Sequence, residues 1–220
     1  MKRIILLSLL CSIASIARSA DITKLIHETQ HMVQGNNNMN MVWWIPNAFW
    51  EETLKQSPQM TEELREQFLA VLEDYSVFVI INVDTGVFGG MTAKSREMII
   101  ENTELRIGEE LIELVAPESM SSDAANFFMM MKPMMAPMMG QMGEGMVFLA
   151  YPNHKDGQKL IDPLEEGSFT VTSFGESFHW RLPLGSLMPP MYDLESGESF
   201  PGNYRFNPFT GSELVNEKPE

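Results

Sequence analysis

Residues 75–83 read YSVFVIINV, a strongly apolar run that is rich in valine and isoleucine. β-Branched and aromatic side chains favour the extended backbone, so this run predicts a buried strand. Asp84-Thr85-Gly86 follows at once and is typical of a tight turn, which leads into residues 87–93. The two segments together predict a hairpin, and with it antiparallel pairing.

Segments on both sides of this hairpin complete the predicted fold. Further strands are expected at 41–45, 98–105, 110–115, 145–151, 169–172 and 178–182. Helices are expected at 22–34, ended by Gly35 and the asparagines after it, and after the N-caps Thr61 and Ser121. No linker interrupts the pattern, so we expect one α+β domain over residues 21–220, with a mainly antiparallel sheet packed against about three helices.

Composition narrows the classes of function. The chain has 220 residues, of which 44% are hydrophobic and 20% charged, and this excludes a wholly disordered protein. It carries 30 acidic residues against 15 lysines and arginines, a net charge of −15. A chain with this negative net charge is not expected to have a basic patch that could bind phosphates. Nucleic acid and anionic membranes are therefore not expected partners.

The N-terminus is typical of a secretory signal peptide. Lys2 and Arg3 precede a mostly apolar run, residues 4–16, which is too short to cross a membrane, and small residues follow it. Cleavage is expected between Ala17 and Ala20, with residues 1–20 as the favoured signal peptide. The mature chain is then an exported protein, periplasmic or secreted, without a transmembrane segment.

The single cysteine, Cys11, lies inside the predicted signal peptide and cannot form an intramolecular disulfide. In the alternative interpretation, Cys11 is the lipid-carrying residue of a lipoprotein. The bulky Leu10 before it argues against this alternative, because such sites take a small residue there.

One short motif points to zinc. Residues 27–31 read HETQH, and on a helix His27 and His31 lie one turn apart on the same face, where both can bind one ion. The fragment resembles the active-site helix of the zincin metallopeptidases. That resemblance implies Glu28 as the general base and Glu51 as the third ligand, on a following helix. The favoured alternative is a solvated first helix without metal, because the short chain upstream leaves no room for the sheet that normally walls a zincin cleft.

A second segment is rich in methionine, with nine of these residues between positions 129 and 146. Thioethers are soft ligands that select Cu(I), and the segment resembles the Met-rich parts of exported copper-handling proteins. The resemblance makes Met134, Met138 and Met142 candidate ligands. The favoured alternative is packing, because three- and four-residue spacing is that of an apolar helix face and methionine fills irregular cores. Kinks at Pro133 and Pro137 favour a third alternative, a flexible hydrophobic surface.

The C-terminus carries an internal repeat. DLESG at 193–197 and NPFTG at 207–211 share one pattern, fourteen residues apart, with the spacing of zinc knuckles. The segment resembles a zinc ribbon that has lost its cysteines, whose positions are taken by Asp193, Ser196, Asn207 and Thr210. Side-chain hydrogen bonds from such residues stabilise turns without an ion. Residues 190–214 are therefore expected to be a metal-free, ribbon-like pair of hairpins.

Three further stretches resemble an uncharacterised family of exported bacterial proteins: MVWWIPNAFW at 41–50, RLPLGSLMPP at 181–190 and GNYRFNPFTGSEL at 202–214. This resemblance implies no activity. The aromatic side chains of the first stretch are expected in the core, in preference to an exposed stacking surface for a sugar or peptide.

The favoured hypothesis is an exported, non-enzymatic domain that binds a protein or a small molecule and needs no cofactor. The first alternative is a zinc-dependent peptidase that uses the HETQH motif. The second is a Cu(I)-binding protein that uses the methionine segment.

Overall fold

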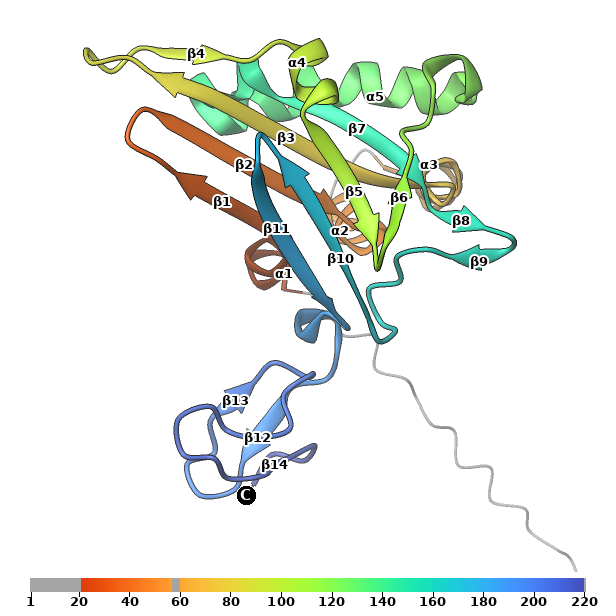
Figure 1. The fold of residues 1–220 in the computed structure, drawn as a ribbon. Coiled ribbons are helices and arrows are strands. Elements are labelled where there is room, and N and C mark those ends of the chain that lie inside the picture. The colour runs from red at the N-terminus through yellow and green to blue at the C-terminus, as the bar shows by residue number, and fades with distance from the viewer. Residues whose placement is uncertain (1–20, 57–59, 220) are drawn as a thin grey trace, which may run out of the picture.

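The apolar run at 75–83 lies at the centre of the fold (Figure 1). The computed structural model describes residues 21–56 and 60–219. This part of the chain has antiparallel sheets and five α-helices, which confirms the predicted α+β class. α4 (Arg96–Glu101) was not predicted from the sequence, and a helix at α2 (Asn47–Lys55) was implied only by the zincin resemblance, which placed Glu51 on one.

The first sheet is built on β3 (Tyr75–Thr85), which pairs antiparallel with three other strands. β2 (Asn38–Ile45) lies on one side of it. β4 (Met91–Ala93) and β7 (Val147–Pro152) share the other side, at opposite ends of β3. β1 (Gln30–Gln34) continues the sheet beyond β2. The β3–β4 pairing confirms the hairpin that the turn at Asp84-Thr85-Gly86 predicted.

A second antiparallel sheet packs on one face of the first. In spatial order its strands are β11 (Glu176–Leu182), β10 (Gly167–Ser173), β5 (Thr103–Ile107) and β6 (Glu110–Ile112). Phe169 and Trp180 stack with their ring centroids 5.0 Å apart, and both contact Phe78 of β3 edge to face. These rings form the core between the two sheets.

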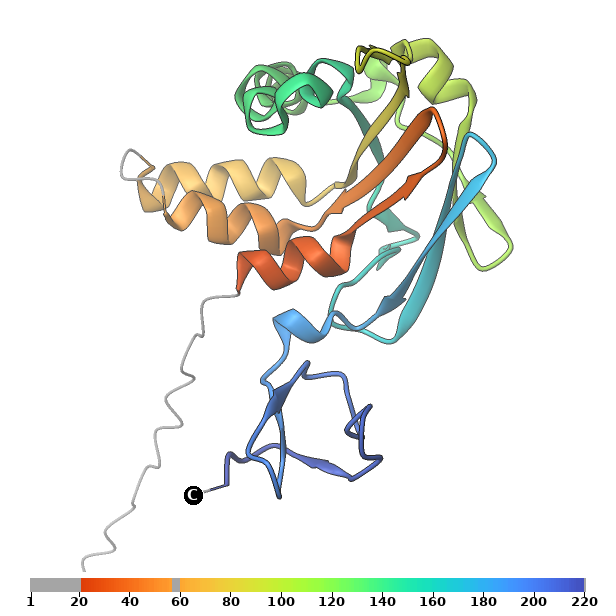
Figure 2. The same cartoon turned by 90° about the vertical axis from the view of Figure 1, so that its left-hand side faces the viewer.

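Helices cover the other face of the first sheet. Figure 2 shows α2 beside α3 (Glu62–Leu72), with α5 (Ser122–Met135) packed near them. Phe127 of α5 contacts the rings of Trp50 and Phe68 edge to face. Because both faces of β3 are covered, its first nine residues are all buried and show no inside–outside alternation.

The predicted helix caps at Thr61 and Ser121 are confirmed. The Thr61 hydroxyl accepts a hydrogen bond from the backbone N–H of Leu64, and the Ser121 hydroxyl accepts one from Ala124. Each satisfies a donor that a helix N-terminus leaves without an intrahelical partner.

The predicted helix at 22–34 is wrong in its second half. α1 (Ile22–Thr29) ends five residues early, and the chain continues as β1. The buried Thr29 hydroxyl bonds to the Leu25 carbonyl and accepts a hydrogen bond from the Trp43 indole. Pairing with β2 then satisfies the extended backbone, and the glycine–asparagine run that was predicted to cap a helix makes the β1–β2 turn.

The predicted strand at 98–105 is wrong at its start. Its first residues belong to α4, whose N-cap Ser95 accepts a hydrogen bond from the backbone N–H of Met98. The strand begins only at Thr103.

The C-terminal unit, residues 191–215, lies apart from the two sheets (Figure 1). It contains β12 (Met191–Asp193), β13 (Ser199–Phe200) and β14 (Leu214–Val215), and a 3-10 turn, η3 (Gly185–Leu187), leads into it. Phe200 and Leu214 are buried within this unit and are not part of the main hydrophobic cluster. Among all the described residues, no helix has the length and apolar character to cross a membrane.

Candidate functional site

The HETQH motif does not form the arrangement that a zincin needs. His27 is on α1, but His31 is on β1, so the two imidazoles do not share a helix face. The His31 ring instead stacks on Trp180, with 4.4 Å between ring centroids and 2° between the ring planes. Within residues 21–56 and 60–219, no three histidine, cysteine or acidic side chains are grouped to hold a metal ion. This geometry gives no support to a zinc peptidase.

His31 has an electrostatic environment of its own. Partial burial lowers the pKa of its imidazole, and the neighbouring His179 lowers that pKa further. The lowered pKa disfavours the charged form of a half-buried ring that stacks on the buried Trp180 indole.

Glu28 anchors another part of the chain. Its two carboxylate oxygens accept hydrogen bonds from the backbone N–H groups of Gly185 and Ser186, at 3.0 and 2.9 Å. These contacts join α1 to the start of η3, and both oxygens that a general base would use are engaged. A hollow of about 560 Å³ lies beside this contact, but acidic and basic side chains line it together, so it favours no ligand charge.

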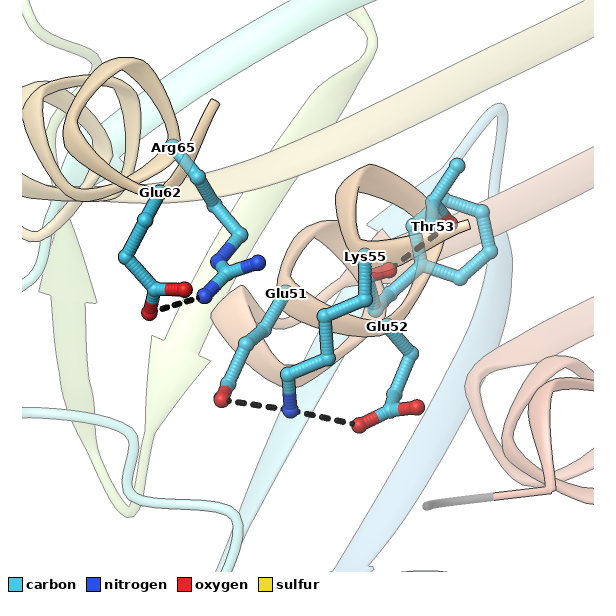
Figure 3. Close-up of polar contacts among 7 residues, drawn as sticks. Glu51, Glu52, Thr53, Lys55, Glu62 and Arg65 are labelled. Carbon is cyan, nitrogen blue, oxygen red and sulfur yellow. Dashed lines mark hydrogen bonds and ion pairs between the residues drawn. The ribbon is translucent and has the colours of Figure 1, made fainter. Parts of the chain in front are cut away.

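Glu51 lies on α2 and forms an ion pair there (Figure 3). Its carboxylate is 2.9 Å from the ammonium group of Lys55, and Glu52 contacts the same ammonium at 3.0 Å. These two hydrogen bonds raise the pKa of Lys55. Figure 3 also shows Glu62 paired with Arg65 on α3, so Glu51 belongs to a set of helix-surface ion pairs rather than to a ligand group.

The methionine segment divides into two sets. The inner set packs on or within the core: Met131, Met135, Met139, Met142 and Met146. The outer set is 59% to 82% exposed: Met129, Met130, Met134 and Met138. The packing interpretation thus holds for the inner set only, and Met134 and Met138, which it placed on the apolar face, are at the surface. The three candidate Cu(I) ligands do not share one environment, because Met142 packs against the core.

The two C-terminal turns meet at Asp193. One carboxylate oxygen of Asp193 accepts hydrogen bonds from the backbone N–H groups of Glu195 and Ser196, and the other accepts from the side chains of Asn207 and Ser212. Asn207 repeats the local pattern, because its side-chain oxygen accepts from the N–H groups of the residues two and three further on. Hydrogen bonds to the carboxylate, that of the Ser212 hydroxyl above all, hold the Asp193 pKa far below its usual range.

The aromatic side chains at 43–50 lie in the core. Trp43, Trp44, Phe49 and Trp50 are all buried, so they offer no exposed stacking surface.

A groove that the sequence did not predict lies between α4, α5 and β7. It has a volume of about 530 Å³, which is within the range of small-ligand sites. Fourteen of its sixteen lining residues are apolar. α5 contributes Ala125, Phe128, Met129 and Lys132, which share one helix face by their spacing, and residues 114–117 form a further wall.

The only charged lining residues of this groove are basic. Arg96 comes from α4 and Lys132 from α5, and no ion pair joins either of them to a carboxylate in the described part of the chain. The Arg96 guanidinium donates a hydrogen bond to the Phe148 carbonyl on the outer edge of β7. The chain has twice as many acids as bases, yet the residues that line this groove include two cations and no acid.

Sequence reasoning missed the groove because its walls come from segments that are far apart in the chain. The one local signal is the apolar spacing of 125, 128 and 129 before Lys132 on the helix that Ser121 caps. Comparisons with protein families, with curated proteins and with solved structures find no match to this chain.

Proposed function

We propose that the protein is an exported binding domain whose groove holds an anionic amphiphile, a ligand with an apolar chain and an acidic head such as a long-chain carboxylate. The observation that carries the proposal is the groove lining, in which fourteen apolar residues accompany Arg96 and Lys132 and no acid. Apolar surface favours the chain of the ligand, and the cations favour its head.

The edge of β7 favours an amphiphile over an extended peptide. A peptide that adds to a sheet needs free backbone groups along the edge strand. Two carbonyls on the outer edge of β7 already accept hydrogen bonds, Phe148 from Arg96 and Ala150 from the N–H of Val115. An aliphatic chain needs no such groups and only has to contact the apolar walls.

Export is part of the proposal and depends on the N-terminal segment. The positive start, the short apolar run and the small residues up to Ala20 support it. These residues lie outside the described part of the chain. N-terminal sequencing of protein from the exported fraction tests it, with a first residue between Arg18 and Asp21 expected and the intact Met1 as the contradicting result.

The ligand is tested by calorimetry on the purified chain. We expect saturable binding of a sixteen-carbon carboxylate below its critical micelle concentration, with much weaker binding of its methyl ester and of an alkyl-trimethylammonium of equal length. Lys132→Gln is expected to weaken carboxylate binding roughly fivefold, the effect of a contact of about 1 kcal/mol. Lys155→Gln is the matched control, because that exposed lysine is outside the groove. Equal affinity for acid and ester, or no binding, would contradict the proposal.

A second candidate function is Cu(I) binding, which the exposure of the outer methionine set favours. Met130 and Met134 are one helical turn apart, and Met138 follows at the same spacing in a 3-10 segment, η2 (Ala136–Gly145). A competition titration with a colorimetric Cu(I) chelator tests it. Retention of one equivalent of Cu(I) that the substitutions Met134→Leu and Met138→Leu abolish supports this candidate. Retention that survives both substitutions contradicts it.

A further inference from the structure

We infer that Met129 is a site of reversible oxidation that lowers the affinity of the groove for its ligand. The affinity part of this inference rests on the proposed function, whereas the site of oxidation does not. Met129 combines two properties that no other methionine of the described chain combines to the same degree. It lines the groove, and 70% of its side chain is exposed to solvent.

The other methionines supply internal comparisons. Met134 is 61% exposed but does not line the groove. Met146 lines the groove but is completely buried. Met131 packs in the core and is only 6% exposed. Met120 also lines the groove but is only partly exposed, so Met129 is the lining methionine most open to an oxidant in the described chain.

The chemistry needs only a peroxide. The thioether sulfur attacks one oxygen of hydrogen peroxide, an S–O bond forms, the O–O bond breaks, and the displaced oxygen leaves as water after proton transfer. The sulfur is oxidised by two electrons and the peroxide is reduced. Cys11, the only cysteine of the sequence, lies outside the described residues, so thioethers are the only sulfur groups in the described chain. Reversal uses a thiol-dependent methionine sulfoxide reductase, which takes the oxygen away as water.

The sulfoxide alters the groove in two ways. It replaces an apolar wall group with a polar, chiral one, which an aliphatic chain contacts less favourably. It also places a strong hydrogen-bond acceptor three residues before Lys132 on the same helix, where i and i+3 side chains are neighbours. The sulfoxide oxygen then competes with the ligand head for the ammonium group.

The first experiment maps oxidation in the whole chain by mass spectrometry after graded treatment with hydrogen peroxide. Met129, Met130, Met134 and Met138 are expected to oxidise at least about tenfold faster than Met131 and Met146, because thioether oxidation follows exposure. Oxidation of Met129 at the rate of the two buried methionines would overturn the inference.

The second experiment measures binding of the sixteen-carbon carboxylate before and after this treatment. Oxidised wild type is expected to bind about tenfold more weakly, and sulfoxide reductase is expected to restore its affinity. Met129→Leu, which keeps the apolar volume, should bind normally and resist the effect, whereas Met134→Leu should remain sensitive. If peroxide treatment still weakens carboxylate binding by Met129→Leu, the effect of Met129 oxidation on affinity is refuted and the proposed function is not. If untreated protein does not bind the carboxylate, both the proposed function and the effect of oxidation on affinity are refuted. The mass-spectrometric map still tests Met129 as the site of oxidation in that case.

Discussion

At the scale of single residues, His31 was a predicted metal ligand, but in the structure its ring packs on Trp180. Its ring extends a stack that continues through Trp180 to Phe169, between the two sheets. A charged imidazole fits this place poorly, because its partial burial removes hydrating water and His179 adds a like charge when it is protonated.

The lowered pKa of His31 has a defined effect on stability. The folded chain binds this proton more weakly than the unfolded chain, so the free energy of unfolding falls as pH drops below about 6.5 and levels off beneath the folded-state pKa. Urea unfolding at several pH values is expected to show a smaller decrease in His31→Phe, which keeps an aromatic ring but cannot titrate. His154→Gln, at an exposed position, should keep the wild-type decrease. Parallel pH profiles for wild type and His31→Phe would contradict this prediction.

Asp193 gives a second prediction at this scale. Because its lowered pKa reflects hydrogen bonds to the charged form, the stabilisation is present above the unfolded value of about 3.9 and is lost only as pH falls through the folded-state pKa. Asp193→Asn replaces an acceptor oxygen with a donor that faces other donors. We expect faster amide hydrogen exchange across 195–212 at neutral pH, with the exchange of β3 unchanged.

The exposed Glu195→Gln is the control for this experiment, and it should leave exchange in the C-terminal unit at the wild-type rate. Unchanged protection in Asp193→Asn would show that the carboxylate does not hold the two turns together.

At the scale of elements, α5 presents three faces with different environments. Phe127 and Met131 face the core, Phe128 and Met129 face the groove, and Met134 faces solvent. Helical periodicity sets which residues share a face. Only the neighbours of the helix decide whether a given face is covered.

This difference between faces predicts the cost of truncation. Met131→Ala removes a nearly buried side chain and is expected to lower the free energy of unfolding by about 2–4 kcal/mol, whereas Met134→Ala should change it by less than about 0.5 kcal/mol. Chemical denaturation of the two variants measures both values. Similar costs for the two substitutions would show that the outer methionines are packed.

The resemblance of the C-terminal turns to a zinc ribbon can be tested by introducing the missing cysteines. The side chains of Ser196 and Asn207 hydrogen-bond to Asp193 directly, and Ser212 links Asp193 to Thr210. Cysteine at all four positions is expected to bind one zinc ion per chain, with the thiolate absorption of the Co²⁺ form as the readout. A three-cysteine variant that keeps Thr210 should bind more weakly. No metal binding by the four-cysteine variant would refute the likeness to a zinc ribbon.

At the scale of the whole molecule, the fold has three layers, and the first sheet, built on β3, lies between the second sheet and the helices (Figure 2). Phe169 is buried where the two sheets meet and contacts rings from both. Packing of this kind makes the layers cooperative, because neither face of the first sheet can remain uncovered in water.

Phe169→Ala is therefore expected to destabilise both sheets together, by about 3–5 kcal/mol. Hydrogen exchange of β2 and β10 should accelerate to a similar extent. Phe209→Ala is the control, since that ring is 85% exposed on the C-terminal unit, and its cost should stay within about 0.5 kcal/mol. Acceleration limited to the second sheet would mean that the two sheets open independently.

The sequence by itself determined the features that depend on neighbouring residues. The caps at Thr61 and Ser121, the buried strand at 75–83 and the repeated turns at 193 and 207 follow from local hydrogen bonding and side-chain pattern. The caps and turns close within a few residues, and the strand is indicated by its own β-branched and aromatic side chains, so the chain carries this information locally.

Tertiary structure alone decided the change from helix to strand after Thr29, the contact of Glu28 with η3 and the groove. In each case the partner lies more than ten residues away: Trp43 for Thr29, Gly185 and Ser186 for Glu28, and β7 for the walls from α4 and α5. Local periodicity at 22–34 favours a helix, but pairing of Gln30–Gln34 with β2 satisfies the same backbone groups and also builds the sheet. Distant pairing outweighs local propensity there, because propensity is worth only tenths of a kcal/mol per residue.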